Sequence, residues 1–275
     1  RPALHAWLQW RPTPDLEFYV DGIFTGYRQD FDVNFFVGLP KAGNVTAVQT
    51  QGGGNATIPS SGLSAPVADT ITTRDNFTIT SKQTFHQVTD GYQFAGGMRW
   101  DVGPALVTTE LTYNDSTVES TSYIVDANFI VPRIDYSFNR DGTPNITPLT
   151  ATGAPFDITD TTILDIFALF DQRSLAVSEQ IAWRGDVRYD FENSWLSNFQ
   201  IGLRFAHRTG VSDGTGENRS QIGVSGDPYP DFGTQGPTDI LGGRLGVDGF
   251  ALPDTDFIRN NIDLLRALAG RPPGP

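Results

Sequence analysis

The residues whose spacing could do chemistry lie in residues 180–191, where charged side chains alternate with neutral ones. Arg184, Asp186 and Arg188 occupy alternate positions there, and Arg204 stands in the segment that follows the next short connection. Because successive side chains of a strand point to opposite faces, these charges fall on one face of a hairpin. We expect Arg184, Asp186, Arg188 and Arg204 to form an ionic ladder across its two strands, and we favour a structural role for them over a substrate role.

The motifs of hydrolysis and phosphate binding are missing from the sequence. It contains no G-x-S-x-G elbow, no H-E-x-x-H and no P-loop. Cysteine is absent, and His5, His86 and His207 are too scattered to indicate a metal site. Residues 139–142 and 213–217 carry only part of the calcium-loop spacing. Acidic residues are plentiful, but none stand out as a pair for glycoside hydrolysis. We therefore predict no catalytic residue, no metal, no cofactor and no enzymatic activity.

The overall charge and hydropathy exclude two further classes. The net charge of −13 disfavours a nucleic-acid partner, whose phosphates need a basic surface. No stretch approaches 18 consecutive apolar residues, so the sequence predicts no transmembrane helix. It has no initiator methionine and no signal peptide, and both ends read as internal, so we expect a piece of a longer protein.

The charged face belongs to one of six segments that alternate apolar and polar residues. We predict strands near residues 3–11, 16–37, 76–100, 105–125, 175–191 and 198–208. The fifth segment has the clearest alternation, since one of its faces carries no charge at six positions in a row. Those positions are Ile181, Trp183, Gly185, Val187, Tyr189 and Phe191.

Connections between these strands are alternately short and long. The long ones cover residues 39–75, 126–174 and 209–275, and we expect them to be extracellular loops. The aromatic residues near the short turns are expected to lie at a lipid interface; they are Trp10, Trp100, Tyr189, Phe191 and Trp195. Glycine recurs on the apolar face, which suits a curved wall better than a sandwich core. The sequence thus favours an all-β fold, an antiparallel segment of a transmembrane β-barrel whose charged ladder faces the lumen.

The predicted loops hold two candidate helices and a few candidate ligand contacts. One short helix is expected near residues 160–170, and a second is expected to be capped by Asp254 or Thr255 and ended by Gly270. Tyr229, Phe232 and Phe138 are candidates for stacking on a ligand ring, although anchoring of the loops themselves is the interpretation we favour.

Three stretches resemble strand pairs of TonB-dependent outer-membrane receptors. They are residues 10–21 (WRPTPDLEFYVD), 181–191 (IAWRGDVRYDF) and 201–208 (IGLRFAHR). The sequence is most similar to receptors of Caulobacter, Xanthomonas and sphingomonad-type proteobacteria. The resemblance is diffuse over most of the chain and strongest in the last hairpin, and it rests on strand patterns rather than on catalytic motifs.

The resemblance implies an internal fragment of roughly six strands from a plugged barrel of about 22 strands, with the plug domain absent from residues 1–275. It also implies active uptake of a carbohydrate, a siderophore or a similar nutrient across the bacterial outer membrane. The implied partners are outer-membrane lipid, the TonB complex through the missing plug, and a small molecule or oligosaccharide. Two alternatives stay open: a passive outer-membrane porin, and a soluble extracellular β-sheet binding module.

Overall fold

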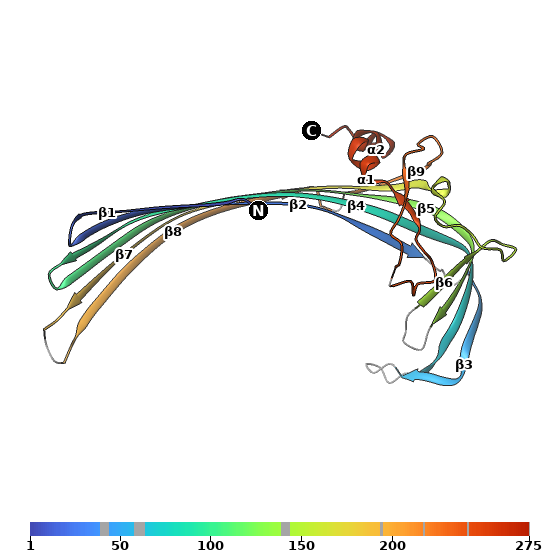
Figure 1. The fold of residues 1–275 in the computed structure, drawn as a ribbon, viewed down its shortest axis with the longest axis horizontal. Coiled ribbons are helices and arrows are strands. Elements are labelled where there is room, and N and C mark those ends of the chain that lie inside the picture. The colour runs from blue at the N-terminus through green and yellow to red at the C-terminus, as the bar shows by residue number, and fades with distance from the viewer. Residues whose placement is uncertain are drawn as a thin grey trace. The chain divides into compact units, whose positions relative to one another are not determined.

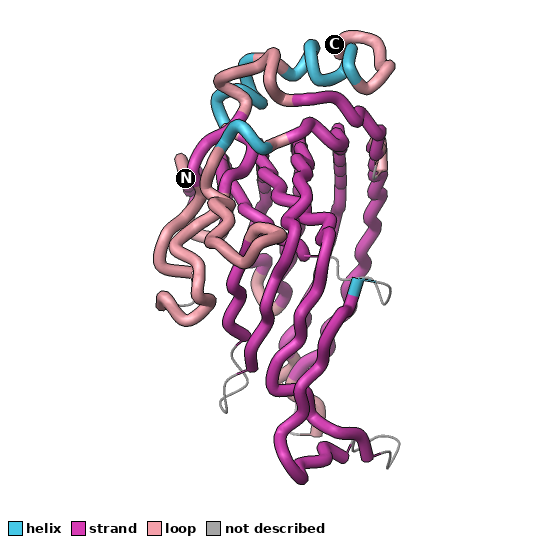
Figure 2. Tube along the Cα trace, turned by 90° about the vertical axis from the view of Figure 1, so that its right-hand side faces the viewer, coloured by secondary structure: helices cyan, strands magenta, loops and turns pink. Residues whose placement is uncertain are grey.

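The computed structural model describes residues 1–38, 44–57, 64–138, 144–192, 195–216, 218–240 and 242–274, without the side chains of 50–57 and 64–67. Within these residues nine strands form one large antiparallel sheet (Figure 1, Figure 2). Its main order is β1-β2-β4-β5-β7-β8, so the described sheet is open at β1 and β8 and forms no closed barrel. The mostly β fold expected from the sequence is confirmed.

The strands of the sheet are unusually long for a globular protein. They are β1 (Ala3–Thr13), β2 (Leu16–Gly38), β3 (Val45–Thr57), β4 (Ser64–Val102), β5 (Ala105–Phe138), β6 (Pro144–Leu149), β7 (Asp165–Asp190), β8 (Asn198–Gly214) and β9 (Arg219–Ser225). Outside the main order, β3 pairs with β4, β6 with β5 and β9 with β7. A second sheet joins β10 (Gly233–Gln235) to β11 (Ala251–Pro253).

The register of the hairpins places apolar residues opposite apolar residues. In the β1–β2 hairpin Leu8 is opposite Val20, and in the β7–β8 hairpin Val187 is opposite Ile201. Residues on either side of these pairs point to the other face, because side chains alternate along a strand. Each hairpin therefore has one apolar face and one polar face, as the sequence predicts.

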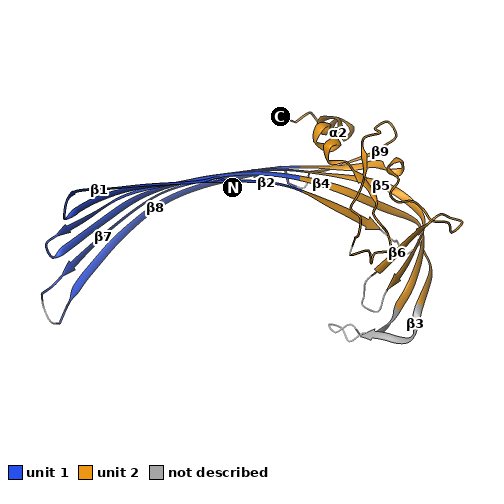
Figure 3. Ribbon diagram, in the orientation of Figure 1, with its two compact units in different colours: residues 1–31, 85–122, 172–216 blue, residues 32–84, 123–171, 217–275 orange. Residues whose placement is uncertain are grey.

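The chain divides into two compact units, each built from parts of the same long strands (Figure 3). Unit 1 comprises Arg1–Phe31, Phe85–Ser122 and Gln172–Gly216. Unit 2 comprises Asp32–Thr84, Tyr123–Asp171 and Glu217–Pro275. The units differ in how their apolar side chains are covered, so each is described by itself.

In unit 1, the turn ends of the β1–β2, β4–β5 and β7–β8 hairpins lie side by side. The β4–β5 turn has Gly103 at φ 59°, a left-handed conformation that glycine adopts without strain. The amide of Asp101 donates to the carbonyl of Asp15 at 2.8 Å, and the amide of Asp190 donates to that of Pro104 at 2.8 Å. These two hydrogen bonds join each turn to the next, so the three hairpins end at the same level.

The apolar face of unit 1 has large exposed side chains. Leu8 is 68% exposed, Leu203 is 60% exposed and Phe205 is 65% exposed. Ala182 is the single hydrophobic residue of unit 1 that is buried among the described residues. A soluble β-sandwich would cover such a face with a second sheet, and the described residues of unit 1 contain none.

Unit 2 has an ordinary hydrophobic core. Val125, Phe129 and Val131 of β5 are buried together with Leu252 and Ile258 of the C-terminal segment. That segment carries β11, α1 (Thr255–Asn260) and α2 (Ile262–Leu268). Packing of these elements buries apolar side chains of the unit 2 strands. The apolar side chains of the unit 1 strands stay exposed.

The structure corrects the predicted loops. Strand β5 runs through Phe138 instead of ending near residue 125, and β7 begins at Asp165. Much of residues 39–75 is strand as well, in β3 and the start of β4, although residues 39–43 and 58–63 lie outside the described part. The stretches taken for loops are rich in threonine, which is polar but β-branched and therefore forms strands readily.

One helix prediction is wrong and the other is confirmed in position. Residues 160–170 hold only the 3-10 helix Thr161–Ile163 before β7 begins. The second predicted helix is present but broken in two, α1 and α2, at Asn261. Asp254 caps α1 by accepting hydrogen bonds from the amides of Asp256 and Phe257, and Gly270 follows α2 at φ 68°. None of the described helices is both long and apolar enough to span a membrane.

Candidate functional site

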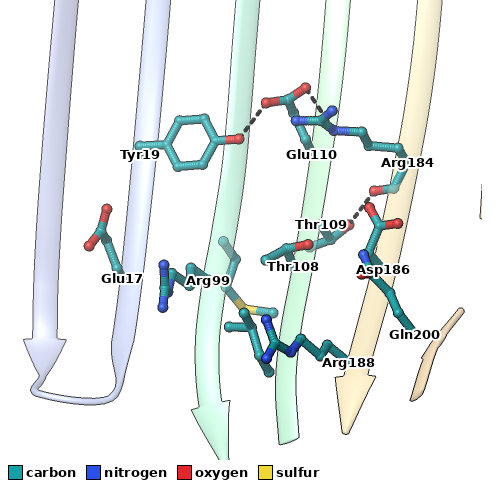
Figure 4. Close-up of a pocket in the computed structure, with 12 residues that line it drawn as sticks. Glu17, Tyr19, Arg99, Thr108, Thr109, Glu110, Arg184, Asp186, Arg188 and Gln200 are labelled. Atoms are coloured by element: carbon teal, nitrogen blue, oxygen red, sulfur yellow. Dashed lines mark hydrogen bonds and ion pairs between the residues drawn. The ribbon is translucent and has the colours of Figure 1, made fainter. Parts of the chain in front are cut away.

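The candidate site is an open groove of about 460 Å³ on the polar face of unit 1 (Figure 4). Side chains from β2, β4, β5, β7 and β8 line it. Its charged and hydrogen-bonding residues include Glu17, Tyr19, Arg99, Glu110, Arg184 and Arg188. The groove thus combines fixed charges of both signs.

A chain of three side chains crosses the floor of this groove. The hydroxyl of Tyr19 on β2 donates to Glu110 on β5, passing over β4, which lies between them. The other carboxylate oxygen of Glu110 lies 3.3 Å from Nε of Arg184 on β7. Figure 4 shows the three side chains in this order. Glu110 is therefore held from both sides, and the contact connects three strands that are not all neighbours.

The crossing is possible because Gly97 of β4 has no side chain. A Cβ at position 97 would lie 2.6 Å from Cε1 of Tyr19, well inside contact distance. The phenol ring therefore occupies the space that a side chain of β4 would take. Glycine within a strand commonly marks such a close approach.

We expect Gly97→Ala to lower the free energy of unfolding by about 1–2 kcal/mol, because the tyrosine ring must leave the strand and Glu110 loses a donor. Unfolding in detergent micelles, followed by circular dichroism, measures the change. The matched control is Gly96→Ala, since a Cβ there meets nothing closer than the Tyr19 carbonyl at 3.8 Å. In a Tyr19→Ala background the cost of Gly97→Ala should vanish; an undiminished cost would show that the ring is not the cause.

The predicted ladder is only partly correct. Arg184 pairs with Glu110 of β5, and not with an acid of its own hairpin. Arg188 lies 2.8 Å from Asp190 on the same strand. Asp186 and Arg204 do face the same side, but Arg204 is directly opposite Arg184 in the register. Two like charges directly opposite each other do not attract. Arg184 is therefore paired with an acid on β5 outside the hairpin, and Arg188 with an acid on its own strand.

The aromatic residues predicted for a lipid interface gather near the hairpin ends of unit 1. Trp10 stacks on Phe18 with centroids 5.6 Å apart, and Tyr189 contacts Phe191 at 4.9 Å. Trp100 and Trp195 are exposed, the latter by 84%. Their contact with lipid stays a prediction.

The three aromatic residues predicted as candidate ligand contacts differ in how deeply they are buried. Phe232 is only 1% exposed and packs edge-on against Phe257 with centroids 5.5 Å apart, which agrees with the favoured interpretation that it anchors its own segment. Tyr229 is half-buried and lines a small cavity of about 160 Å³ in unit 2. Phe138 stands at the end of β5, 38% exposed. The structure brings none of them to the groove.

The histidines are engaged in pairs rather than in a cluster. His5 lies 2.5 Å from Asp21 and His86 lies 2.7 Å from Asp30, whereas His207 is opposite Ile181. Among the residues that the structure describes, no group of three or more metal-binding side chains comes together.

The apolar face of unit 1 is interrupted by a polar row that sequence reasoning missed. On β2, Gly26 is followed at the next same-face position by Arg28, which lies 2.9 Å from Asp90 of β4. On β7, Ile181 is followed on that face by Glu179, which is opposite Thr209. The sequence shows this row, because at this level the same-face positions of β2, β4 and β7 are charged, with Arg28, Asp90 and Glu179. Beyond the row, β7 and β8 carry exposed apolar residues again, Leu175 and Val211.

A buried carboxylate in unit 2 is the clearest electrostatic feature outside the groove. Asp126 is 9% exposed and accepts a hydrogen bond of 2.6 Å from the hydroxyl of Ser81. Burial raises the pKa of Asp126, and the Ser81 hydrogen bond and the charge of Arg219 oppose that rise only in part.

We expect this burial to make stability depend on pH. Because the pKa of Asp126 is higher in the folded than in the unfolded chain, its contribution is fully present below the unfolded pKa and is lost as pH rises through the folded one. Asp126→Asn should therefore gain stability over the original chain as the pH of unfolding measurements rises from about 4 to 7.

Asp157→Asn serves as the control of opposite sign. Hydrogen bonds from Thr159 lower the pKa of Asp157, so this variant should lose stability relative to the original chain over the same pH rise. A difference between Asp126→Asn and the original chain that does not change with pH would contradict the assignment.

The chain was compared with known proteins by two routes. No protein-family model matches it, and no curated protein matches it.

Proposed function

We propose that this chain is part of the wall of a TonB-dependent receptor in the bacterial outer membrane. In this proposal the receptor takes up a scarce nutrient such as a carbohydrate or a siderophore. The observation that carries the wall assignment is the uncovered apolar face of unit 1, which stands opposite a charged face on the same strands. Such a sheet needs an apolar environment on one side and water on the other.

The height of the apolar face supports this assignment. Its uninterrupted part extends over residues 18–26 of β2, 92–100 of β4 and 181–189 of β7, between the hairpin ends and the polar row that contains Arg28 and Asp90. Nine residues rise roughly 27 Å along a strand. At the tilt of about 40° that outer-membrane strands adopt, this is roughly 21 Å of height, close to the 25 Å apolar band of such barrels. Lipid is thus the natural cover for this face.

The two free edges support a wall that continues beyond the chain. β1 and β8 end the described sheet with one unpaired edge each, and unpaired edges favour further strand pairing. In the proposal, further strands of the same protein complete a barrel of about 22 strands. The plug domain and its contact with the TonB complex rest on the sequence resemblance alone. The proposal includes no catalytic role.

Energy-dependent uptake tests the function. Cells that carry the whole protein should accumulate a labelled oligosaccharide or iron-siderophore complex, and a protonophore should stop this accumulation, as should loss of the gene. Cell fractionation should recover the protein in the outer membrane. Uptake that persists without a proton gradient would favour the passive porin, and recovery without detergent would favour the soluble binding module.

A further inference from the structure

A cluster of aromatic rings and one guanidinium in unit 2 takes no part in the groove or the wall. We call it the Arg219 cluster: Phe77, Phe167, Phe170 and Arg219. The guanidinium carbon of Arg219 lies 5.3 Å from the ring centroid of Phe167 and 5.7 Å from that of Phe170. Phe77 contacts Phe167 edge-on, with centroids 5.3 Å apart. The three rings are half-buried and Arg219 is exposed, so the cluster is open to solvent.

An irregularity of the sheet accompanies this arrangement. The register of β7 and β9 shifts between Ile166 and Ala168, and Phe170 is directly opposite Arg219. Residues three apart on a regular strand point to opposite faces, yet Phe167 and Phe170 both contact the same guanidinium. Such irregularities often re-aim side chains beside functional sites.

The hydrogen-bonding capacity of Arg219 is not consumed within the described part of the chain. Asp126 is close enough to interact with it electrostatically, but the hydrogen bond of that carboxylate comes from Ser81. Among the described residues, Arg219 has ring contacts and no hydrogen bond or ion pair. Its planar fork of N–H donors matches the two oxygens of a carboxylate.

We propose that the Arg219 cluster binds a carboxylate carried on a six-membered ring, with the guanidinium holding the carboxylate and the phenylalanine rings holding the ring. This proposal deepens the proposed function, on which it rests, by naming the chemistry of the ligand. Two sources share this chemistry, an aromatic acid and the uronic acid of an oligosaccharide. The phenylalanine rings can pack against either ligand, because an aromatic acid offers a flat ring face and a sugar ring offers C–H groups.

Calorimetric titration of the purified full chain in detergent tests the proposal. The probes are benzoate and galacturonate, with benzyl alcohol and galactose as their neutral counterparts. We expect at least one acid to bind and its neutral counterpart to bind roughly tenfold more weakly or worse, because the charge-assisted hydrogen bonds are missing. Binding of benzoate alone assigns an aromatic acid, and binding of galacturonate alone assigns a sugar acid.

Matched variants separate binding from folding. Arg219→Gln should weaken the acid roughly tenfold or more, and Arg219→Lys should restore part of the affinity. Phe170→Leu should weaken it by about two- to tenfold. Arg74→Gln is the control, since Arg74 is also an exposed arginine of unit 2 and lies outside the Arg219 cluster.

Three results would overturn the proposal: no binding of either acid, equal binding of acids and neutral counterparts, or an Arg219→Gln variant with lowered stability but unchanged affinity. The last would make Arg219 only the counter-charge of Asp126. Calorimetry measures binding alone and does not depend on membrane location or uptake. Absence of binding would therefore contradict the ligand site without contradicting the proposed role of the chain in a membrane wall. Conversely, absence of energy-dependent uptake would contradict the proposed function but would not change the affinity measured for the acid.

Discussion

Replacement of Arg266 with methionine is expected to lower the free energy of unfolding of unit 2 by about 3–5 kcal/mol. Arg266 of α2 is 4% exposed, and its Nε lies 2.7 Å from Asp171 of β7. Its Nη1 lies 2.9 Å from Asp263. The hydrogen bond with Asp171 raises the pKa of Arg266, so the guanidinium stays charged over the whole working pH range. Removal of the cation leaves a mostly buried carboxylate without this partner.

Hydrogen exchange of the α2 and β7 amides measures the effect, because it reports local opening as well as global unfolding. Arg259→Met is the control: that arginine forms an exposed ion pair with Asp32 at 3.3 Å, for which we expect less than about 1 kcal/mol. The double variant Arg266→Met with Asp171→Leu should recover much of the loss, since an apolar pair needs no counter-charge. Equal protection in the Arg266 and Arg259 variants would contradict the assigned role.

Replacement of Leu203 with arginine is expected to destabilise the protein in a lipid bilayer by about 2–4 kcal/mol. Leu203 is 60% exposed on the apolar face of β8, opposite Gly185 and midway along the apolar run of that strand. In water an exposed leucine is replaced by arginine at little cost. In the proposed wall the same position faces hydrocarbon, where an arginine loses its hydration.

Reversible unfolding in phosphatidylcholine vesicles measures this cost. Gln93→Arg introduces the same side chain at an exposed position on the polar face of β4 and should change stability by less than about 0.5 kcal/mol. Equal effects of the two variants in lipid would mean that the apolar face does not contact the bilayer.

The faces of the strands could be predicted from the sequence because they depend on a period of two alone. Residues 181–189 show this directly. The odd-numbered positions, which form the apolar face, are all neutral, and their partners on β8 follow from the hairpin register. Strand length was harder to predict. The extension of β5 to Phe138 includes Asp126 and Asn128, whose polarity suggests a loop. Packing of the C-terminal segment on this part of β5 stabilises the strand, and such long-range contacts leave no local signal.

The candidate site likewise has one part that the sequence predicts and another that it does not. The sequence placed Arg184, Asp186, Arg188 and Arg204 on one face, which the register bears out. It could not supply the partner of Arg184, because Glu110 lies on β5, which is far away in sequence. The passage of Tyr19 over Gly97 likewise depends on which strands are neighbours. For Phe232 the favoured interpretation, anchoring of its own loop, agrees with the structure, because the ring is inserted into the core of unit 2. The polar segment around it, rich in glycine and proline, gives no sign of which core residues it contacts.

The central claim is that one face of unit 1 contacts lipid and the other contacts water. The chain has no cysteine, so Leu203→Cys and Arg204→Cys each place a single thiol in it, on adjacent residues of opposite faces. With a fluorophore attached to each thiol in outer-membrane vesicles, we predict that lipid-bound quenchers act on position 203 and aqueous iodide on position 204. Quenching of both positions by iodide, with no effect of the lipid-bound quencher, would contradict the claim.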